Sequence, residues 1–337
     1  MKKKGKHLIR HLLNSCNLYR LFNYFTRNNV VIFMLHRIQD PSIGYIRPHL
    51  TADRLDRCLE YLVKYKYHVL SFYELINEAI EKKKLYKTVC FTVDDGYIDF
   101  KNIAYPLFKK HNFPATVFIT TDFVEGKLML WRDQIEFILE QTTKPSLVLD
   151  CENNHFSFPL HNKEERKRAA LILIGYFKSL PFDQVNSSIM RLSRILDVDL
   201  PNTPPLQYSA LSWEDIREME KDKIDFQPHT VTHPILSKIK YSEQAWQIKK
   251  SKEAILDNIR SKPVIYCYPN GMTGDFTEET ISLLKKEGFL ASCVAELGFF
   301  NPELSDFFRI PRIPFPRNYI DFVYHVSGCK ILQLAIT

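Results

Sequence analysis

The feature that most constrains the fold of this chain is an alternation, from residue 30 onward, of short apolar runs with longer amphipathic segments. The runs are rich in β-branched and aromatic residues, as expected of buried strands, and we place them at 30–35, 89–93, 115–120, 225–229, 264–269 and 291–295. The longer segments carry apolar residues at helical spacing, and we place helices at 52–65, 72–83, 100–111, 242–259 and 277–288. Strands that alternate with helices predict an α/β fold with a parallel sheet.

One long segment, residues 131–208, interrupts this alternation. Its pattern is helical or irregular, and it contains two proline-containing stretches, at 158–159 and 201–205. We interpret it as an insertion into the body of strands and helices. Six or more such strands can close into a barrel or lie open, and periodicity alone does not choose between these two arrangements.

The composition is that of an ordinary folded protein. Hydrophobic residues make up 45% and charged residues 25% of the 337 residues, and a chain of this length can bury one large core or two small ones. The seven cysteines are scattered and never stand in a CxxC spacing. This argues against a disulfide framework or a cysteine zinc site and favours a reducing compartment.

The net charge of +7 is concentrated at the amino terminus, because residues 1–29 hold seven basic residues and no acidic residue. Polar residues interrupt every apolar run there that could serve as a secretory signal. No stretch is as long as the run of about 18 apolar residues that a membrane-spanning helix requires. The segment is amphipathic at helical spacing, so it is either an interfacial helix on an anionic membrane or a terminal segment of the domain. We expect a cytoplasmic protein, peripheral on the inner membrane face in the first case, and no nucleic-acid partner.

Two adjacent acids end the second predicted strand. In CFTVDDGYIDF, residues 90–100, an apolar run leads into Asp94, Asp95 and Gly96. Neighbouring side chains on a strand point to opposite faces, so both carboxylates can serve one site only where the chain turns, which Gly96 permits. The carboxyl ends of parallel strands are where such sheets hold active sites. The alternative is a solvated turn, which Asp-Asp-Gly also suits.

Two histidines stand four residues apart in FQPHTVTHP, residues 226–234. On a helical turn this spacing places the imidazoles of His229 and His233 on one side, where they can share a metal ion. Two histidines and one carboxylate leave positions open for water and substrate, as in catalytic zinc or cobalt sites. The alternative is two unconnected surface histidines, since the chain has eleven histidines.

Together, these two segments resemble the first two motifs of the polysaccharide deacetylases, the NodB-homology domain of carbohydrate esterase family 4. The segment VIYCYPNG, residues 264–271, resembles the third motif. The resemblance implies a distorted (β/α) barrel of about seven strands with a helical insertion. The organisation that we expect is a basic segment at 1–29, a catalytic domain at 30–320 that contains the insertion, and a tail at 321–337.

The resemblance also implies roles for individual residues. Asp95, His229 and His233 would bind a divalent metal ion, most simply zinc, with cobalt or another divalent ion as the alternative. Asp94 would be the general base, and a backbone N–H near Tyr268 would help to stabilise the oxyanion. The residues expected to contact the substrate are Tyr268 and Pro269, in the third motif. Trp213 is a further candidate because aromatic rings suit a sugar-stacking cleft.

The sequence departs from the family pattern at two catalytic positions. The third motif usually carries an arginine that orients the base, but here residues 266–269 read YCYP, and Arg309 or Arg312 is the candidate replacement. The last family motif, Leu-x-His, is absent after His233. His36, directly after the first predicted strand, is therefore the candidate for the general acid or for a substrate contact.

A third departure lies just before the histidines, where Gln227 and Pro228 replace the small residues that are common in relatives. We expect this change to alter the shape of the pocket more than its chemistry. It removes no catalytic group.

The activity that the resemblance implies is hydrolysis of an N-acetyl group from an amino sugar of a polysaccharide or of a lipid-linked glycan precursor. The basic amino terminus favours the lipid-linked precursor, with peripheral membrane contact through that segment. Two other classes remain open: a catalytically silent sugar-binding module of the same fold, and a metal-dependent phosphoesterase. The presence of both aspartates and both histidines argues against the first, and the second would be expected to gather more basic or metal-binding residues.

Overall fold

The structure is a computed structural model of the chain, and it describes residues 28–39, 50–151 and 154–328. The predicted amphipathic amino-terminal segment lies almost entirely outside these residues, as does the end of the predicted tail. Within the described ranges, no helix is both long enough and apolar enough to cross a bilayer.

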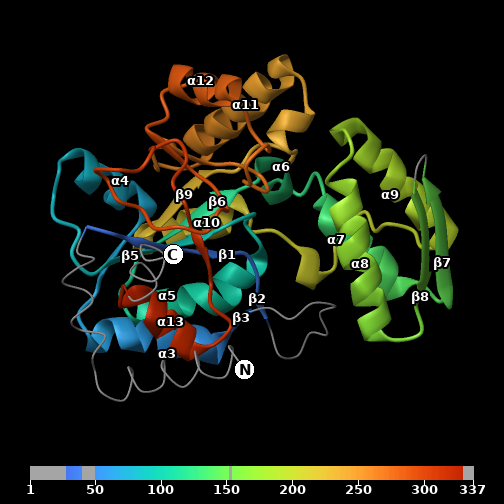
Figure 1. Cartoon of the computed structure of the whole chain (residues 1–337), viewed down its shortest axis with the longest axis horizontal. Coiled ribbons are helices and arrows are strands. Elements are labelled where there is room, and N and C mark those ends of the chain that lie inside the picture. The colour runs from blue at the N-terminus through green and yellow to red at the C-terminus, as the bar shows by residue number, and fades with distance from the viewer. Residues whose placement is uncertain (1–27, 40–49, 152–153, 329–337) are drawn as a thin grey trace, which may run out of the picture.

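Parallel strands form the centre of the molecule (Figure 1), in the order β12-β1-β5-β6-β9, with β4 paired to β5. Every pairing in this sheet is parallel, which confirms the predicted fold class. The strands are β1 (Val31–Leu35), β4 (His68–Leu70), β5 (Thr88–Val93), β6 (Ala115–Ile119), β9 (Ile224–Pro228) and β12 (Ile313–Pro314).

Two more parallel strands, β10 (Ile265–Cys267) and β11 (Ala291–Cys293), pair with each other beside β9. A parallel bridge joins Cys293 to Ile310, just before β12. In the described part of the chain no backbone ladder connects β9 to β10. The fold is therefore a distorted (β/α) barrel with an interrupted seam.

Gln227, on β9, spans this seam. Its side chain is fully buried, and its Oε1 accepts hydrogen bonds from the N–H groups of Val264 and Ile265 at 3.1 and 3.0 Å. Its Nε2 donates to Asp225 and to the carbonyl of Lys262. The expectation that Gln227 shapes the pocket is corrected, because the side chain replaces missing backbone hydrogen bonds inside the sheet.

The body helices lie where the periodicity predicts them, with small differences at their ends. They are α3 (Ala52–Lys64), α4 (Phe72–Ile80), α5 (Tyr105–Lys110), α11 (Tyr241–Asn258) and α12 (Glu278–Lys286). The predicted helix at 100–111 is divided, because Phe100–Ala104 forms a π-helical turn before α5. Pro106, in the first turn of α5, has no N–H to donate to the preceding turn.

Shorter elements connect these. They are β2 (Ile38–Gln39), β3 (Leu50–Thr51), α6 (Thr121–Val124), η2 (Leu206–Tyr208), α10 (Trp213–Met219), η3 (Glu220–Asp222) and η4 (Leu236–Lys238).

Residues 131–208 form a lobe at the right of Figure 1, with a hydrophobic core of its own. Its elements are α7 (Trp131–Gln141), β7 (Ser146–Cys151), β8 (Asn154–Pro159), α8 (Lys163–Phe177) and α9 (Phe182–Leu196). The antiparallel β7–β8 hairpin corrects the expectation of a helical or irregular insertion. Alternate residues of β7 are exposed and buried, the pattern of a half-buried strand, and its apolar run is only Leu147-Val148-Leu149.

The carboxyl-terminal helix α13 (Tyr319–Val326) packs on the main core. Phe322 is fully buried, and its ring stacks on that of Phe33 with centroids 5.1 Å apart. The predicted boundary between domain and tail, at 320/321, therefore cuts through a helix, and residues up to Val326 belong to the body.

Candidate active site

Both aspartates follow β5, at the carboxyl end of the sheet. The N–H of Asp94 donates to the carbonyl of Leu35 at 2.9 Å, which continues the pairing with β1 by one residue. The chain then reverses, with φ of 80° at Asp95 and 91° at Gly96. A Cβ at Gly96 would lie 3.1 Å from the side chain of Ile119, so only glycine suits this position. The reversal brings the two carboxylates to one site, and a left-handed Asp95 costs about 1–3 kcal/mol, a strain typical of functional sites.

His229 and His233 lie in the loop after β9, with ring centroids 4.9 Å apart. The rings are close, as the spacing suggested, but the helical turn that we expected is wrong. Thr230 and His233 have φ of 71° and 60°, which no right-handed helix contains. The loop is fixed by hydrogen bonds from His233 N–H to Thr230 Oγ1 and from Val231 N–H to Gln247 on α11.

Asp95, His229 and His233 direct side-chain atoms to a common point. The Nε2 atoms of His229 and His233 lie 3.5 and 3.2 Å from Asp95 Oδ1. That oxygen is buried and has no hydrogen-bond partner among the described residues. The Nδ1 of His229 lies 2.8 Å from the carbonyl of Cys267, which can only accept, so the lone pair is on Nε2. These donors fit a divalent metal ion.

Asp94 is held by Arg312. Nη1 donates to Oδ1 at 2.6 Å and Nη2 to Oδ2 at 2.8 Å, a bidentate pair whose side chains are only 1% and 3% exposed. Arg312 also donates to Thr92 Oγ1 and to the carbonyl of Val294. Burial raises the pKa of Asp94, but the charge and hydrogen bonds of Arg312 act with the charges of His36 and His229 in the opposite direction, and the net shift of that pKa is downward. Asp94 is therefore an oriented, ionised carboxylate.

Of the two arginines offered by the sequence, Arg312 is the one beside the base. Arg309 pairs with Asp306 and Glu278 on the surface instead. Arg312 reaches the site because β12 begins at the next residue and lies parallel to β1.

His36 follows β1 and faces Asp94, with 3.7 Å between His36 Nε2 and Asp94 Oδ2. Its side chain is 39% exposed, so a substrate can reach it. Removal from water lowers the pKa of His36, and the negative charges of Asp94 and Asp95 act in the opposite direction.

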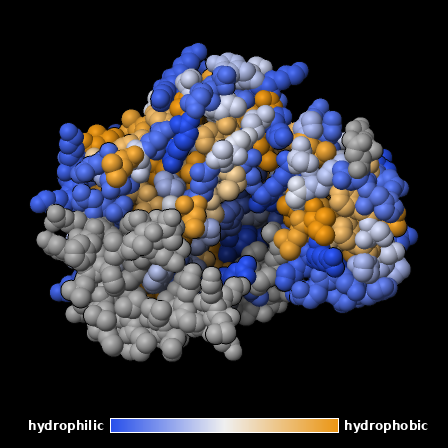
Figure 2. All heavy atoms as spheres, viewed as in Figure 1, coloured by the Kyte–Doolittle hydropathy of each residue, from blue (hydrophilic) through white to orange (hydrophobic). Residues whose placement is uncertain are grey.

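A cleft of about 530 Å³ opens above these groups, within the size range of small-molecule sites. Hydrophilic side chains gather in the hollow between the body and the lobe (Figure 2). The body contributes His36, Arg37, Asp95, Tyr97 and Arg317, and the lobe contributes Arg132, Asp133, Glu136, Lys167 and Leu171. The sequence analysis identified only His36 and Asp95 among these ten.

Tyr97 joins the body to the lobe inside the cleft. Its hydroxyl donates to Asp133 Oδ2 at 2.7 Å, and burial raises the pKa of Asp133 to about 7. The guanidinium of Arg37 lies 3.9 Å from the centre of the Tyr97 ring, and its Nε donates to Asp99 at 2.5 Å. These contacts fix the start of α7 beside the aspartates. The sequence signals were present, since Arg37 follows His36 and Tyr97 follows the Asp-Asp-Gly turn.

Comparison with known proteins assigns the family. The sequence model described as polysaccharide deacetylase matches residues 81–291, which is more than half of the chain. The chain belongs to the polysaccharide deacetylase family. None of the curated proteins compared with it matches.

Solved deacetylases share its fold at low sequence identity. The Streptococcus pyogenes deacetylase PplD, in complex with acetate, is 17% identical with a TM-score of 0.59, over 90% of this chain and 99% of that one. IcaB from Ammonifex degensii is 16% identical with a TM-score of 0.56, over 89% and 97%. The de-N-acetylase from Aggregatibacter actinomycetemcomitans is 15% identical with a TM-score of 0.55, over 88% and 99%.

The three substrate contacts expected from the sequence do not line the cleft. The Tyr268 side chain is 1% exposed, stacks on Phe276 at 3.9 Å and donates to the carbonyl of Phe308. Its N–H, a candidate for oxyanion binding, is directed at a carbonyl of β11 at 3.4 Å. Pro269 is buried, and Trp213 packs on the main core. These expectations are corrected, because aromatic residues are more often core than binding surface.

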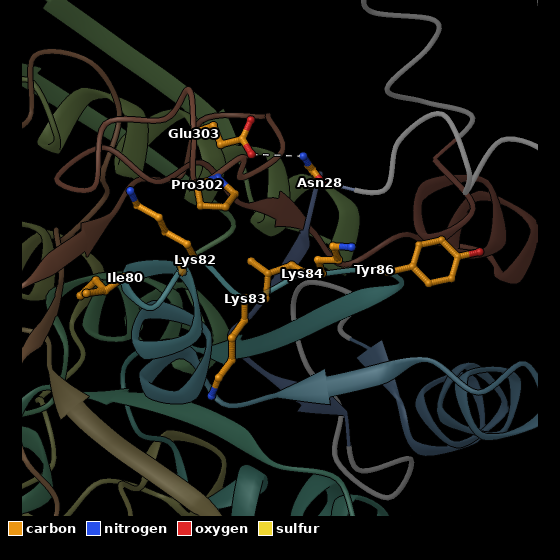
Figure 3. A pocket seen from close by; sticks show the side chains of 10 residues that line it. Asn28, Ile80, Lys82, Lys83, Lys84, Tyr86, Pro302 and Glu303 are labelled. Carbon is orange, nitrogen blue, oxygen red and sulfur yellow. Dashed lines mark hydrogen bonds between the residues drawn. The ribbon is translucent and has the colours of Figure 1, made fainter.

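A larger hollow, of about 1020 Å³, lies at the other end of the sheet (Figure 3). It is lined by residues that precede β1 and β5, among them Asn28, Lys82, Lys83 and Lys84. The deacetylase motifs lie at the carboxyl ends of these strands. Size therefore does not identify the active site in this family member, whereas the aspartates and histidines do.

Proposed function

We propose that the protein is a metal-dependent hydrolase that removes an N-acetyl group from an amino sugar of a glycan and releases acetate. One observation carries this proposal: a buried oxygen of Asp95 that has no hydrogen-bond partner among the described residues faces His229 and His233, while Asp94 beside it is oriented by Arg312. The first group suits a cation and the second suits a base.

Asp95, His229 and His233 would hold the cation. Zinc is the first choice because two imidazoles and one carboxylate are typical ligands of catalytic zinc, and cobalt or another divalent ion is the alternative. When bound, the ion supplies Lewis acidity toward the acetamide carbonyl and lowers the pKa of water at the site.

Asp94 acts as the general base. The charge of Arg312 keeps its carboxylate ionised, and the two hydrogen bonds fix the plane of the carboxylate. Asp94 takes one proton from the water that adds to the acetamide carbon. Arg312 takes no proton and is a positioning residue, because an arginine stays charged.

His36 acts as the general acid. It faces Asp94 across 3.7 Å and is open to the cleft, so its protonated form, which the charges of Asp94 and Asp95 favour, can deliver a proton to the departing amine nitrogen. The C–N bond breaks as that proton arrives, and the products are acetate and a free amino sugar. The two proton transfers, one to Asp94 and one from His36, balance the addition of water.

We further propose that the glycan is a lipid-linked precursor, used at the inner face of a membrane to which residues 1–29 attach. The support is the charge of that segment, with seven basic and no acidic residues, which suits an anionic lipid surface. Acetate release from a lipid-linked N-acetylhexosamine, compared with free chitooligomers, tests this. Reaction of the free oligomers alone would overturn it.

The activity itself is tested by metal analysis together with acetate release. We expect about one divalent ion per purified chain and acetate production that a chelator abolishes. Asp94→Asn should keep the metal and lose the activity, and His161→Gln, at an exposed position, is the matched control that keeps both. Sugar binding without any acetate release would instead favour the catalytically silent module.

A further inference from the structure

We propose that the cleft between the lobe and the body contains a phosphate subsite, so that the acetylated sugar carries a phosphate group on it or directly beside it. This inference rests on the proposed function, because it concerns the substrate of the same cleft. Three cations line the cleft in addition to the catalytic groups. They are Arg132 on α7, Lys167 on α8 and Arg317 in the segment before α13.

Arg132 has no carboxylate partner among the described residues. Its Nη2 donates to Asn270 Oδ1 at 3.0 Å, and its Nε is buried without a hydrogen-bond acceptor in the same part of the chain. A neutral amide does not compensate the charge of a guanidinium that is partly withdrawn from water. An anion in the cleft would supply both the missing charge and the missing acceptor.

The positive charges of Lys167 and Arg317 are also only weakly compensated by nearby acidic groups. Among the residues that the structure describes, Lys167 pairs only with Glu164, one turn earlier on α8, at 3.3 Å, and Glu164 is 81% exposed. Such surface pairs contribute little. The guanidinium of Arg317 makes no ion pair or hydrogen bond within the described residues, and Arg54 donates to its carbonyl at 2.7 Å, which adds another cation nearby.

The acids of the cleft do not cancel these charges. Asp95 belongs to the proposed metal site, and burial raises the pKa of Asp133 to about 7, so this acid is partly neutral near pH 7. Arg37 is paired with Asp99, so the two charges cancel and add nothing to the net charge of the cleft. Of the remaining cleft residues, Glu136 carries one negative charge, and Arg132, Lys167 and Arg317 carry three positive charges. With a divalent ion in place, the cleft is positive.

A neutral glycan would form no ion pairs with these cations, whereas a phosphorylated one would. Phosphate oxygens match the planar fork of arginine, and lysine binds phosphate as a point charge. Three cations from three separate elements suit a group with more than one anionic oxygen better than a single carboxylate. Since two of the three come from the lobe, the insertion would set the substrate specificity of this family member.

The test compares acetate release by the metal-loaded full chain from methyl N-acetylglucosaminide, N-acetylglucosamine 1-phosphate, N-acetylglucosamine 6-phosphate and a disaccharide of N-acetylglucosamine with glucuronic acid. We expect kcat/KM to favour a phosphorylated sugar at least about tenfold, the size of one hydrogen bond to a charged group. In the double variant Arg132→Gln, Arg317→Gln this ratio should fall toward one. Arg191→Gln, an exposed arginine of α9 in the same lobe, should keep the wild-type ratio.

A second readout does not depend on turnover. Binding of the preferred sugar phosphate is measured by calorimetry on the metal-loaded Asp94→Asn chain, with and without the double substitution, and the double substitution should weaken binding at least about tenfold. Equal rates for all sugars, a preference for the uronate disaccharide, or unchanged binding in the double variant would overturn the subsite. Absence of acetate from every sugar, or release of phosphate instead, would overturn the proposed function, and calorimetry would still decide the subsite.

Discussion

Arg312 donates two parallel hydrogen bonds to Asp94, which lies 218 positions earlier in the chain. Its Nη2 is also 3.2 Å from Cys267 Sγ, in the segment that resembles the third family motif. The guanidinium that this motif lacks in sequence is therefore supplied in space from the segment that enters β12.

Replacing Arg312 by methionine leaves the Asp94 carboxylate buried without its cation. We expect a loss of about 3–5 kcal/mol in the free energy of unfolding, measured with urea, and loss of acetate release. Adding Asp94→Asn to the same chain should recover part of the stability and none of the activity. Arg309→Met, an exposed arginine three positions away, is the control, and an equal loss of stability in that variant would contradict the account.

Removal of a proposed metal ligand should abolish metal binding. We expect His229→Gln to weaken the affinity for zinc by more than about 100-fold, because even residues that only orient metal ligands contribute about 10–100-fold. Zinc titration of the apoprotein measures the change. An unaltered zinc affinity would place the metal at a site that does not use His229. It would exclude both metal-binding groups found among the described residues, because each contains His229.

Replacement of His36 by glutamine should separate proton transfer from metal binding. We expect kcat to fall by about 10²–10⁴-fold with little change in zinc affinity. The measurement is steady-state acetate release beside a zinc titration of the same preparation. A full rate without His36 would mean that another group protonates the amine.

The side chain of Gln227 bridges the seam between β9 and β10. Gln227→Leu keeps the volume but leaves the N–H group of Ile265 buried and unpaired, which costs about 1–3 kcal/mol. The N–H group of Val264 loses one acceptor and keeps the carbonyl of Lys262. Urea unfolding should show this loss. Gln184→Leu, at an exposed position, should leave the midpoint nearly unchanged.

Asp225, also on β9, predicts a pH dependence of stability. Burial raises its pKa from 3.8 to about 6, and Glu74 acts in the same direction, while hydrogen bonds from Gln227 and Thr116 partly oppose it. The folded state therefore binds this proton more tightly than the unfolded state does, so the contribution of Asp225 to stability is lost as pH rises from about 4 through about 6. The stability of the wild type relative to Asp225→Asn should fall across that range, and a constant difference would contradict the assignment.

The elements with a simple period were predictable from sequence. The apolar run Thr88–Val93 is favourable only as a buried strand, and the amphipathic segment Ala52–Lys64 is favourable as a helix with one buried face. The structure contains this strand and this helix. The strand β7 was missed because its alternate residues face solvent. Positive φ angles at Asp95 and His233 were not predictable, since they depend on tertiary hydrogen bonds and not on local preference.

The site itself was predictable in chemistry but less so in geometry. The aspartates and histidines stand in recognisable motifs, whereas Arg312 and Arg309 are equivalent on sequence grounds and only the packing of β12 beside β1 separates them. Tyr268 failed as a substrate contact because its ring is part of the core. The cations of the lobe carry no motif, and folding alone brings them to the cleft.

The central claim is that Asp95, His229 and His233 bind a metal ion that is required for N-deacetylation with Asp94 as base. The most direct measurement is acetate release from N-acetylglucosamine oligomers and N-acetylglucosamine phosphates by the full chain, before and after chelation and after zinc is restored. The account predicts equimolar acetate and free amine, lost on chelation, recovered with zinc, and absent in an Asp94→Asn chain that still binds zinc. Acetate release that persists in the metal-free chain, or that survives in Asp94→Asn, would contradict it.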